Sequence, residues 1–594
     1  MPQHPACPSM LGVSWSGSTA WSTRFRWLGL PLLVGLLALL MPAATSAQDE
    51  DGVDTDVQGL VLDSIDVSIV NLEVYVTDKK GNRITGLKRE DFELLANRKP
   101  IAITNFFEVE GGAATTDTGR PLVSDNLDPR LQADPRRRKV PEDQRLHLIV
   151  YVDNLNLRPF TRNRTIRYIR TFLRNRLRPG DEVMLATYER SLHIRHQFTS
   201  DPEIISSALY DVEEMSGMGV HADSERRDIL RDIYEADSIN LIRGRATQYA
   251  ESMFSDMRFT LDALKELIDT LAGLPGRKAI LYVSDGLPMR AGDDIFHAMY
   301  DRFTDSSDNV LMDGLRYDLS RQFQELTARA NTHRVTFYTV DASGLRTYSY
   351  MDASNSSIGG GSKIDQVHFT NIQSSLRMMA SETGGMVLLN TNNYEPLLNR
   401  VAEDFDTYYS LGFSPASTES GRYHRLKVKV KGRKGLVVRT RDGYRDKPVS
   451  TRMSEGTLAA LHYGYQSNPL GIEIEIGEEN TKSKDRFLVE VKVRIPIAKL
   501  SFLPQEDMQR GRLRLFISAK DAEGGLAPVQ DVPVPIDIPQ AEFERAQEQT
   551  YQYSMKLIMR GGRQVVAVGV RDEIGAVNGF ATRGVRIGSI GRSR

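Results

Sequence analysis

The stretch Arg277–Pro288, RKAILYVSDGLP, contains a short apolar run, 279–283, that is rich in β-formers. The run follows the turn Leu274-Pro275-Gly276 and ends in Ser284-Asp285-Gly286. About four to eight apolar residues between such breakers are typical of a buried parallel strand. Open α/β sheets bind ligands just beyond the carboxyl ends of their strands. Asp285 is therefore a candidate site residue.

An earlier stretch, Leu146–Asp153, LHLIVYVD, has the same character, since it is an apolar strand that ends in a carboxylate. A helix-like segment follows it, with Ile166, Ile169 and Leu173 at helical spacing. Two parallel strands that each end in Asp place two carboxylates on one edge of one sheet. Such carboxylates repel one another, share a proton or hold a hard cation.

Strand and helix patterns alternate over 145–413, which predicts βαβ units and a mostly parallel sheet. Two charged insertions, 215–255 and 286–315, interrupt this rhythm and flank the predicted strand ends. Two interpretations of them stay open: a cap over a ligand site, or decoration of a solvated face.

The flanking segments have β-type patterns. Val67–Thr77 and Tyr423–Lys431 alternate as half-buried strands do, and a Gly-containing turn and a return strand follow the second of them. Several short strands with turn signals occupy the C-terminal part. We predict a small β-domain at 60–110, a linker at 111–144, an α/β domain at 145–413, a β-hairpin extension at 414–446, a linker at 447–464 and a β-sandwich at 465–594.

The first residues, 1–47, have the pattern of a signal peptide, with the apolar run Trp27–Met41, WLGLPLLVGLLALLM, before small residues that end at Ala47. An uncleaved anchor is the alternative. Residues 48–59 are acidic, and we expect a disordered N-terminus there. These patterns predict a secreted, periplasmic or cell-envelope protein that keeps no membrane span after cleavage.

Composition excludes several classes of function. The only cysteine, Cys7, lies within the predicted leader, so the mature chain has no disulfide, thiolate metal site or catalytic thiol. The 76 Lys and Arg nearly balance the 78 Asp and Glu, which gives no reason to expect binding to nucleic acid or to anionic membranes.

Seven stretches together resemble the von Willebrand factor A-related proteins of bacteria, of the acidobacterial type. They are VNLEVYVTDKKGNRITGLKREDFELL at 70–95, RKAILYVSDG at 277–286, VTFYTVDASGL at 335–345, ASETGG at 380–385, YYSLGFSP at 408–415, YHRLKVKVK at 423–431 and RTRDGYR at 439–445. The resemblance covers about 60–446 and implies a Rossmann-like von Willebrand factor A domain. The predicted fold class is thus a multidomain chain in which this domain lies between a small N-terminal β-domain and a C-terminal β-sandwich.

The resemblance also implies a metal-ion-dependent adhesion site, which would make Mg²⁺ or Mn²⁺ the candidate cofactor. That site uses Asp-x-Ser-x-Ser after the first strand, a distant Thr and an Asp after the fourth strand. Asp153 matches the first Asp, Asp285 the last, and Thr260 is the candidate Thr, but Leu155 and Leu157 stand at the two serine positions. The alternative is that the two aspartates cap helices or turns.

Enzyme motifs are missing from the sequence: it contains no His-Glu-x-x-His, no Gly-x-Ser-x-Gly and no Walker A pattern. We interpret the chain as a binding or adhesion-type protein with a protein or glycan partner, and not as an enzyme. A structural scaffold of the cell envelope with an inactive metal site is the alternative, and an enzyme of unknown type is the third possibility.

Overall fold

The computed structural model describes residues 69–111, 113–116, 145–178, 180–304, 309–346, 361–415, 421–465, 467–483 and 486–588. The predicted signal peptide at 1–47, the predicted disordered N-terminus at 48–59 and residues 117–144 of the predicted linker lie outside them.

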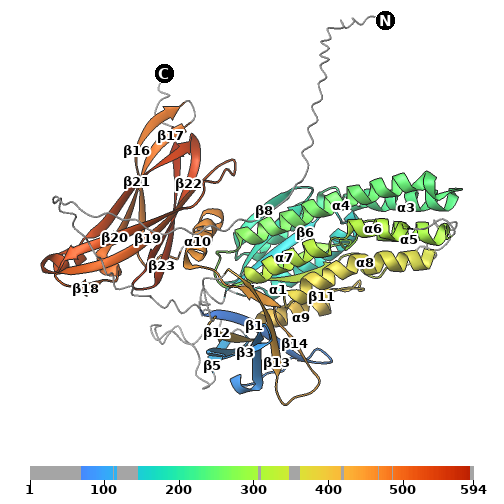
Figure 1. The fold of residues 1–594 in the computed structure, drawn as a ribbon, viewed down its shortest axis with the longest axis horizontal. Coiled ribbons are helices and arrows are strands. Elements are labelled where there is room, and N and C mark those ends of the chain that lie inside the picture. The colour runs from blue at the N-terminus through green and yellow to red at the C-terminus, as the bar shows by residue number, and fades with distance from the viewer. Residues whose placement is uncertain are drawn as a thin grey trace, which may run out of the picture. The chain divides into compact units, whose positions relative to one another are not determined.

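A six-stranded sheet forms the centre of the predicted α/β domain (Figure 1). Its order is β11-β10-β9-β6-β7-β8, and every neighbouring pair is parallel except β7 and β8. The strand order reverses between β6 and β9, and doubly wound sheets bind ligands at this point. The strands are β6 (Leu146–Asp153), β7 (Glu182–Tyr188), β8 (Leu192–Thr199), β9 (Arg277–Ser284), β10 (Val335–Asp341) and β11 (Val387–Leu388).

Helices cover both faces of this sheet. One core contains Ile166, Leu209 and Leu398, which come from α1 (Pro159–Arg176), α2 (Pro202–Glu214) and α9 (Glu395–Asp406). The other contains Leu264, Phe323 and Leu376, which come from α4 (Ile239–Thr270), α7 (Ser320–Thr332) and α8 (Gly361–Glu382). Every residue of β6 and β9 is buried, which explains their continuous apolar sequences.

The two insertions pack on each other around a core of their own. This core includes Ile229 of α3 (Gly219–Glu235), Ile242 of α4, Phe296 of α5 (Asp293–Arg302) and Val310 of α6 (Val310–Gly314). A short 3₁₀ turn, η5 (Leu315–Tyr317), follows α6.

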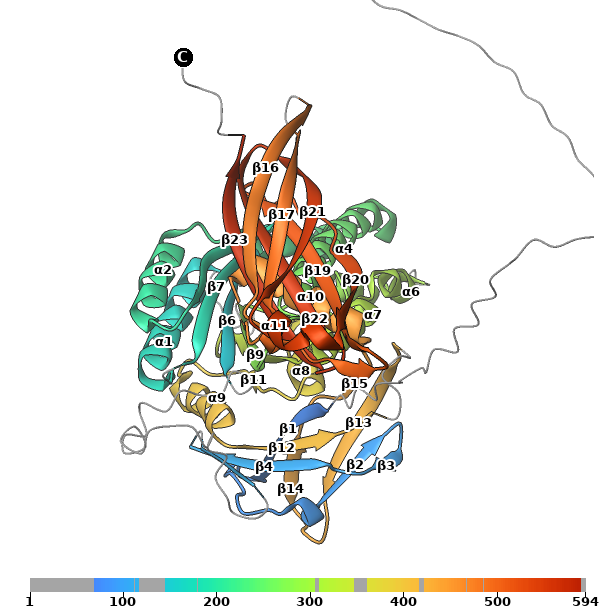
Figure 2. The same ribbon diagram turned by 90° about the vertical axis from the view of Figure 1, so that its left-hand side faces the viewer.

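The predicted end of the α/β domain at residue 413 is wrong, because strand β12 (Tyr408–Phe413) belongs to another sheet. The sequence pattern assigned it to that domain, but it pairs antiparallel with β1 (Val70–Asp78) and β4 (Asn105–Glu110), between which it lies (Figure 2). Five of its six residues are buried. A strand buried on both faces has the same apolar pattern in either sheet, so periodicity cannot identify its partner.

The predicted β-hairpin extension is also different in the structure. Strand β13 (Tyr423–Val430) pairs with β2 (Phe92–Ala96) and β15 (Gly443–Arg445), whereas β14 (Leu436–Arg439) pairs with β1. No ladder joins β13 to β14 within the residues that the structure describes. The predicted domains 60–110 and 414–446 thus form one β-module around a shared core. The module also contains η1 (Arg89–Asp91), β3 (Lys99–Ile101) and β5 (Ala113–Thr116), the last inside the predicted linker.

The predicted linker at 447–464 is mostly a helix, α10 (Val449–Tyr463). Its Met453 and Leu461 pack against Phe516 and Phe580 of the C-terminal domain.

The C-terminal domain is the β-sandwich that the sequence predicts. Two sheets, β16-β17-β21 and β18-β19-β22-β23 with β20 paired to β19, share one apolar core. The strands are β16 (Glu473–Ser483), β17 (Arg486–Pro496), β18 (Leu503–Gln505), β19 (Met508–Asp521), β20 (Gln530–Pro539), β21 (Thr550–Arg560), β22 (Gly562–Asp572) and β23 (Val577–Ile587). The connections hold η8 (Ile497–Lys499), η9 (Gln540–Glu542) and α11 (Phe543–Gln547).

Candidate functional site

Asp153 ends β6 and is completely buried. Its Oδ2 accepts hydrogen bonds from the hydroxyl of Tyr282 at 2.6 Å, Oγ of Ser284 at 3.0 Å and Nδ2 of Asn156 at 2.8 Å. Burial raises the pKa of Asp153, although these donors oppose the effect. One oxygen of this carboxylate is thus fully used inside the protein.

Asp285 lies just beyond the end of β9. Its Oδ2 accepts hydrogen bonds from the main-chain N of Arg158 at 3.2 Å, Nε of Arg158 at 3.1 Å and Oγ1 of Thr161 at 3.0 Å. Arg158 is the N-cap residue of α1, so the carboxylate also faces the positive end of a helix. Burial raises the pKa of Asp285, and the charge of Arg158 counteracts this rise.

The structure places Asp153 and Asp285 at the same edge of the sheet, as predicted, with Asn156 between them. Asn156 donates its side-chain amide to Asp153, and its main-chain oxygen accepts from the N–H of Asp285 at 3.3 Å. The Oδ1 atom of each aspartate is buried and accepts no hydrogen bond from the described residues.

Thr260, the third predicted ligand, does not join them. It is buried within α4, where its Oγ1 donates to the main-chain oxygen of Asp256 at 2.9 Å. Its other polar neighbour is the hydroxyl of Tyr188. The sequence could not reveal this, because the position of a distant Thr relative to the strand ends depends on tertiary packing.

The residues at this edge do not fit a divalent cation. Leu157 is completely buried in the core on one face of the sheet, and Leu155 is almost buried in the core on the other. Mg²⁺ requires about six oxygen ligands in octahedral geometry, and these two side chains supply none. Arg158 adds a positive charge next to Asp285, which would repel an ion there. The described residues contain no group of three or more His, Cys, Asp or Glu that could hold a metal ion.

A pocket of about 620 Å³ opens above Asp285. Arg158 extends into it, with Nη1 at 3.5 Å from Oδ2 of Asp223 and Nη2 at 3.2 Å from Oγ of Ser343. The side chain of Arg158 is 40% exposed and that of Asp223 is 47% exposed. Asp285 thus holds the guanidinium of Arg158 through Nε, and the two terminal nitrogens of Arg158 face the pocket.

A second arginine, Arg346, fixes the neighbouring strand end. Its Nη2 donates to Oδ1 of Asp341 at 2.8 Å and to the main-chain oxygen of Asp285 at 2.6 Å. Gln373 of α8 donates to the other oxygen of Asp341 at 3.1 Å. Sequence reasoning missed both Arg158 and Arg346. The available signal was an arginine that follows each strand-end aspartate by five residues.

Both insertions contribute to the wall of this pocket, which supports the cap interpretation. Arg226 of α3 pairs with Asp294 of α5 and lies 3.5 Å from Asp365 of α8. Nδ1 of His368 lies 3.5 Å from Oδ2 of Asp294, and burial lowers the pKa of this histidine. These buried charges connect three helices beside the pocket.

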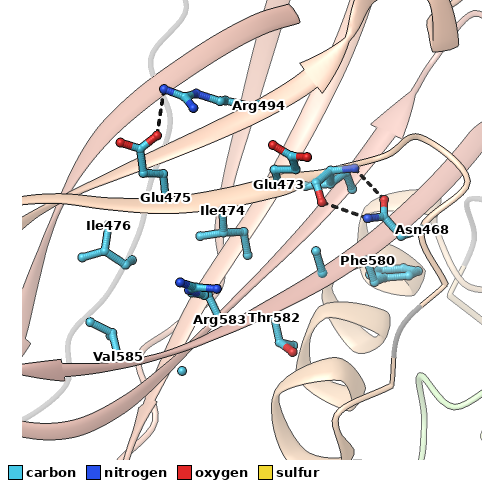
Figure 3. Close-up of a pocket in the computed structure, with 13 residues that line it drawn as sticks. Asn468, Glu473, Ile474, Glu475, Ile476, Arg494, Phe580, Thr582, Arg583 and Val585 are labelled. Atoms are coloured by element: carbon cyan, nitrogen blue, oxygen red, sulfur yellow. Dashed lines mark hydrogen bonds and ion pairs between the residues drawn. The ribbon is translucent and has the colours of Figure 1, made fainter.

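Another pocket, of about 560 Å³, lies in the sandwich between strands β16 and β23 (Figure 3). Half-buried apolar side chains, such as Ile474 and Val585, line it. Its charges include both signs, since Glu475 pairs with Arg494 at 2.7 Å. This pocket therefore shows no preference for a ligand of one charge.

Within the described residues, no helix has both the length and the apolar composition that crossing a membrane requires.

No protein-family model matches the chain, and no curated protein matches its sequence. Solved structures similar to part of it include the hypothetical protein BatB from Bacteroides thetaiotaomicron, at 10% identity over 44% of this chain and 96% of that chain, with a TM-score of 0.21. An aerotolerance-related membrane protein from Bacteroides fragilis has 10% identity over 44% of this chain and 98% of its own, also with a TM-score of 0.21. Proximal thread matrix protein 1 from the mussel byssus has 11% identity and a TM-score of 0.21 over 44% of this chain, and the match spans 48% of the mussel protein. Similarities of this size carry no argument, so the fold assignment rests on the strand order itself.

Proposed function

We propose that the chain is a secreted or envelope-associated binding protein of adhesion type. Its von Willebrand factor A-like domain would bind a carboxylate of a protein or glycan partner without a divalent cation. The observation that carries the proposal is the position of Arg158, which is anchored to Asp285 and partly exposed in the pocket at the switch point of the sheet.

The chemistry of this site suits a carboxylate ligand. A guanidinium offers several N–H donors in a planar fork, which matches a carboxylate. Asp285 fixes the inner side of Arg158, so little side-chain freedom remains to be lost on binding. In the free protein Asp223 stands near the outer N–H groups of Arg158, at 3.5 Å and on an exposed part of α3. A partner's carboxylate would replace Asp223 there.

The test uses an array of short peptides, each with one Asp or Glu in a neutral background, probed with the purified protein with and without EDTA. We expect binding that EDTA does not change, that falls about tenfold in Arg158→Gln and that rises in Asp223→Asn, since one charged hydrogen bond is worth about 1.5–3 kcal/mol. Arg167→Gln is the matched control, because Arg167 is an exposed arginine elsewhere on α1.

Binding that requires Mg²⁺, or that is equal in Arg158→Gln and in Arg167→Gln, would overturn the proposal. Stable assemblies in size-exclusion chromatography that EDTA does not dissociate, together with no binding to any acidic peptide, would favour the scaffold alternative.

A further inference from the structure

The two strands on either side of the turn 431–435, β13 and β14, diverge from each other. A groove of about 1140 Å³ lies along them. Consecutive strands joined by so short a turn ordinarily pair with each other. Here β13 joins the sheet of β2, and β14 joins the sheet of β1. Strands β13 and β14 form one wall of the groove. The α/β domain supplies the other wall, through helices α7, α8 and α9 and strand β11.

Among the described residues, this groove is lined by strand edges that have no neighbouring strand. β11 and β14 are edge strands, and β15 pairs with β13 over Tyr423–Arg425 alone. Within the described part of the chain, no strand pairs with the remaining side of β13 along Lys427–Val430, whereas the N–H of Leu426 already donates to the main-chain oxygen of Asp442 at 2.8 Å. Unpaired strand edges offer main-chain N–H and C=O groups to an added strand.

The groove is also strongly basic. Arg377 of α8 and Arg400 of α9 lie on one wall, and Arg425 and Lys427 of β13 lie on the other. All four side chains are exposed, and none takes part in the ion pairs found among the described residues, although the charge of Arg425 acts on the nearby Asp442. The two carboxylates that line the groove are Glu382, which accepts a hydrogen bond from Thr327, and Asp442.

The spacing of the charges matches an extended chain. Arg425, Lys427 and Lys429 are exposed, while Leu426 and Val428 between them enter the core of the β-module. Alternate residues of a strand lie about 7 Å apart on the same face. An extended segment with an acid at every second residue would therefore place its carboxylates at the same interval.

We propose that this groove binds an extended acidic segment of a partner protein, which adds as a strand along the free edges and pairs its carboxylates with the four basic side chains. The site is separate from the pocket above Asp285, and the proposal does not depend on a ligand there.

The test measures fluorescence anisotropy of a labelled peptide of alternating Glu and Thr with the full chain. Three comparison probes are the same peptide with Gln for Glu, a version with N-methyl groups on alternate residues, and a sulfated glycan as competitor. The groove variant carries Arg377→Glu and Lys427→Glu. The control variant carries Lys556→Glu and Arg586→Glu, which reverse two exposed charges on β21 and β23 of the sandwich. Thermal unfolding checks that both variants fold.

We expect binding of the Glu peptide that weakens with salt, that falls at least about tenfold in the groove variant and that is unchanged in the control, since two attractive contacts are replaced by like-charge repulsion. We also expect both the Gln peptide and the N-methylated peptide to bind about tenfold more weakly. No binding of the Glu peptide, equal losses in the two variants, or full binding of either modified peptide would overturn the proposal. Tighter binding of the glycan at the same basic residues would identify a polyanion site and would also overturn it.

Discussion

Arg158 donates a hydrogen bond of 3.1 Å from Nε to Oδ2 of Asp285, so an arginine at the start of α1 neutralises the carboxylate at the end of β9. A carboxylate that is buried at this edge requires a positive partner or a proton, because an isolated buried charge is costly. In this chain the partner is a covalently attached side chain, not an ion from solution. The cation therefore stays in place when divalent metals are removed.

The pair of Arg158 and Asp285 should be energetically coupled. We expect Arg158→Gln to destabilise the protein by about 2 kcal/mol, below the 3–5 kcal/mol of a fully buried pair, because Arg158 is partly exposed. Asp285→Asn should cost less, since it removes the buried charge. Differential scanning calorimetry of both single variants and of the double variant gives the coupling energy. Strictly additive effects would mean that the ion pair contributes nothing.

Divalent cations should not bind at the sheet edge. Isothermal titration of Mg²⁺ and Mn²⁺ into the protein is expected to show no saturable heat. Leu155 and Leu157 stand where the site would need two oxygen ligands, and Arg158 already neutralises Asp285. The melting temperature should be the same in EDTA and in Mg²⁺. Saturable binding that disappears in Asp153→Ala would show instead that the two unpaired Oδ1 atoms hold an ion.

Glu73 of β1 should make stability depend on pH. Burial raises the pKa of Glu73, but Arg334, Arg441 and Arg277 outweigh this effect and lower it from 4.5 to about 2. Since the folded pKa lies below the unfolded one, the stabilisation is present above about pH 4.5 and is lost as the pH falls towards 2. Glu73→Gln should lose about 3 kcal/mol at neutral pH and little near pH 2. Urea unfolding at both pH values tests this, and an equal loss at both would contradict the linkage.

Asp442 should have the opposite pH dependence. Asp442 is exposed, but partial desolvation by its neighbours and the nearby Glu382 raise its pKa to about 6, although Arg425 opposes them. Because the folded pKa of Asp442 lies above the unfolded one, its protonated form stabilises the fold. This stabilisation is fully present below the unfolded pKa, about 3.8, and is lost as the pH rises through 6. Asp442→Asn should therefore melt at a higher temperature than the unchanged protein near pH 7 and at a similar temperature near pH 4. A lower melting temperature of the variant near pH 7 would refute this.

Two glycines near the ends of α4 should respond in opposite ways to alanine. A Cβ on Gly273 would clash with the main-chain oxygen of Glu455, so Gly273→Ala must push α10 away and should cost about 2 kcal/mol. Gly244 is exposed within α4 and has no atom within 4 Å of an added Cβ. Gly244→Ala should stabilise the helix by up to about 1 kcal/mol. Thermal melts of both variants test the contrast, and equal shifts would refute it.

Many of the individual strands are evident from the amino-acid sequence alone, although the predicted half-buried alternation of β1 is wrong, because Val74–Thr77 are buried on both faces. The apolar runs that end in Asp153 and Asp285 became neighbouring parallel strands, and the short strands after 465 became a sandwich. These features depend on local periodicity and on turn residues, which a single sequence displays directly.

Strand pairing and the contacts between charged side chains became evident from the three-dimensional structure and not from the sequence. Strand β12 joined the β-module, the two strands of the predicted hairpin joined different sheets, and Thr260 lies within α4, where it donates to the main chain of Asp256. Arg158 and Asp285 are 127 residues apart in the chain, yet they share a hydrogen bond. The periodicity of a sequence predicts that a side chain is buried, but it does not predict which residues pack against that side chain. Those partners depend on how elements that are distant in the sequence pack together.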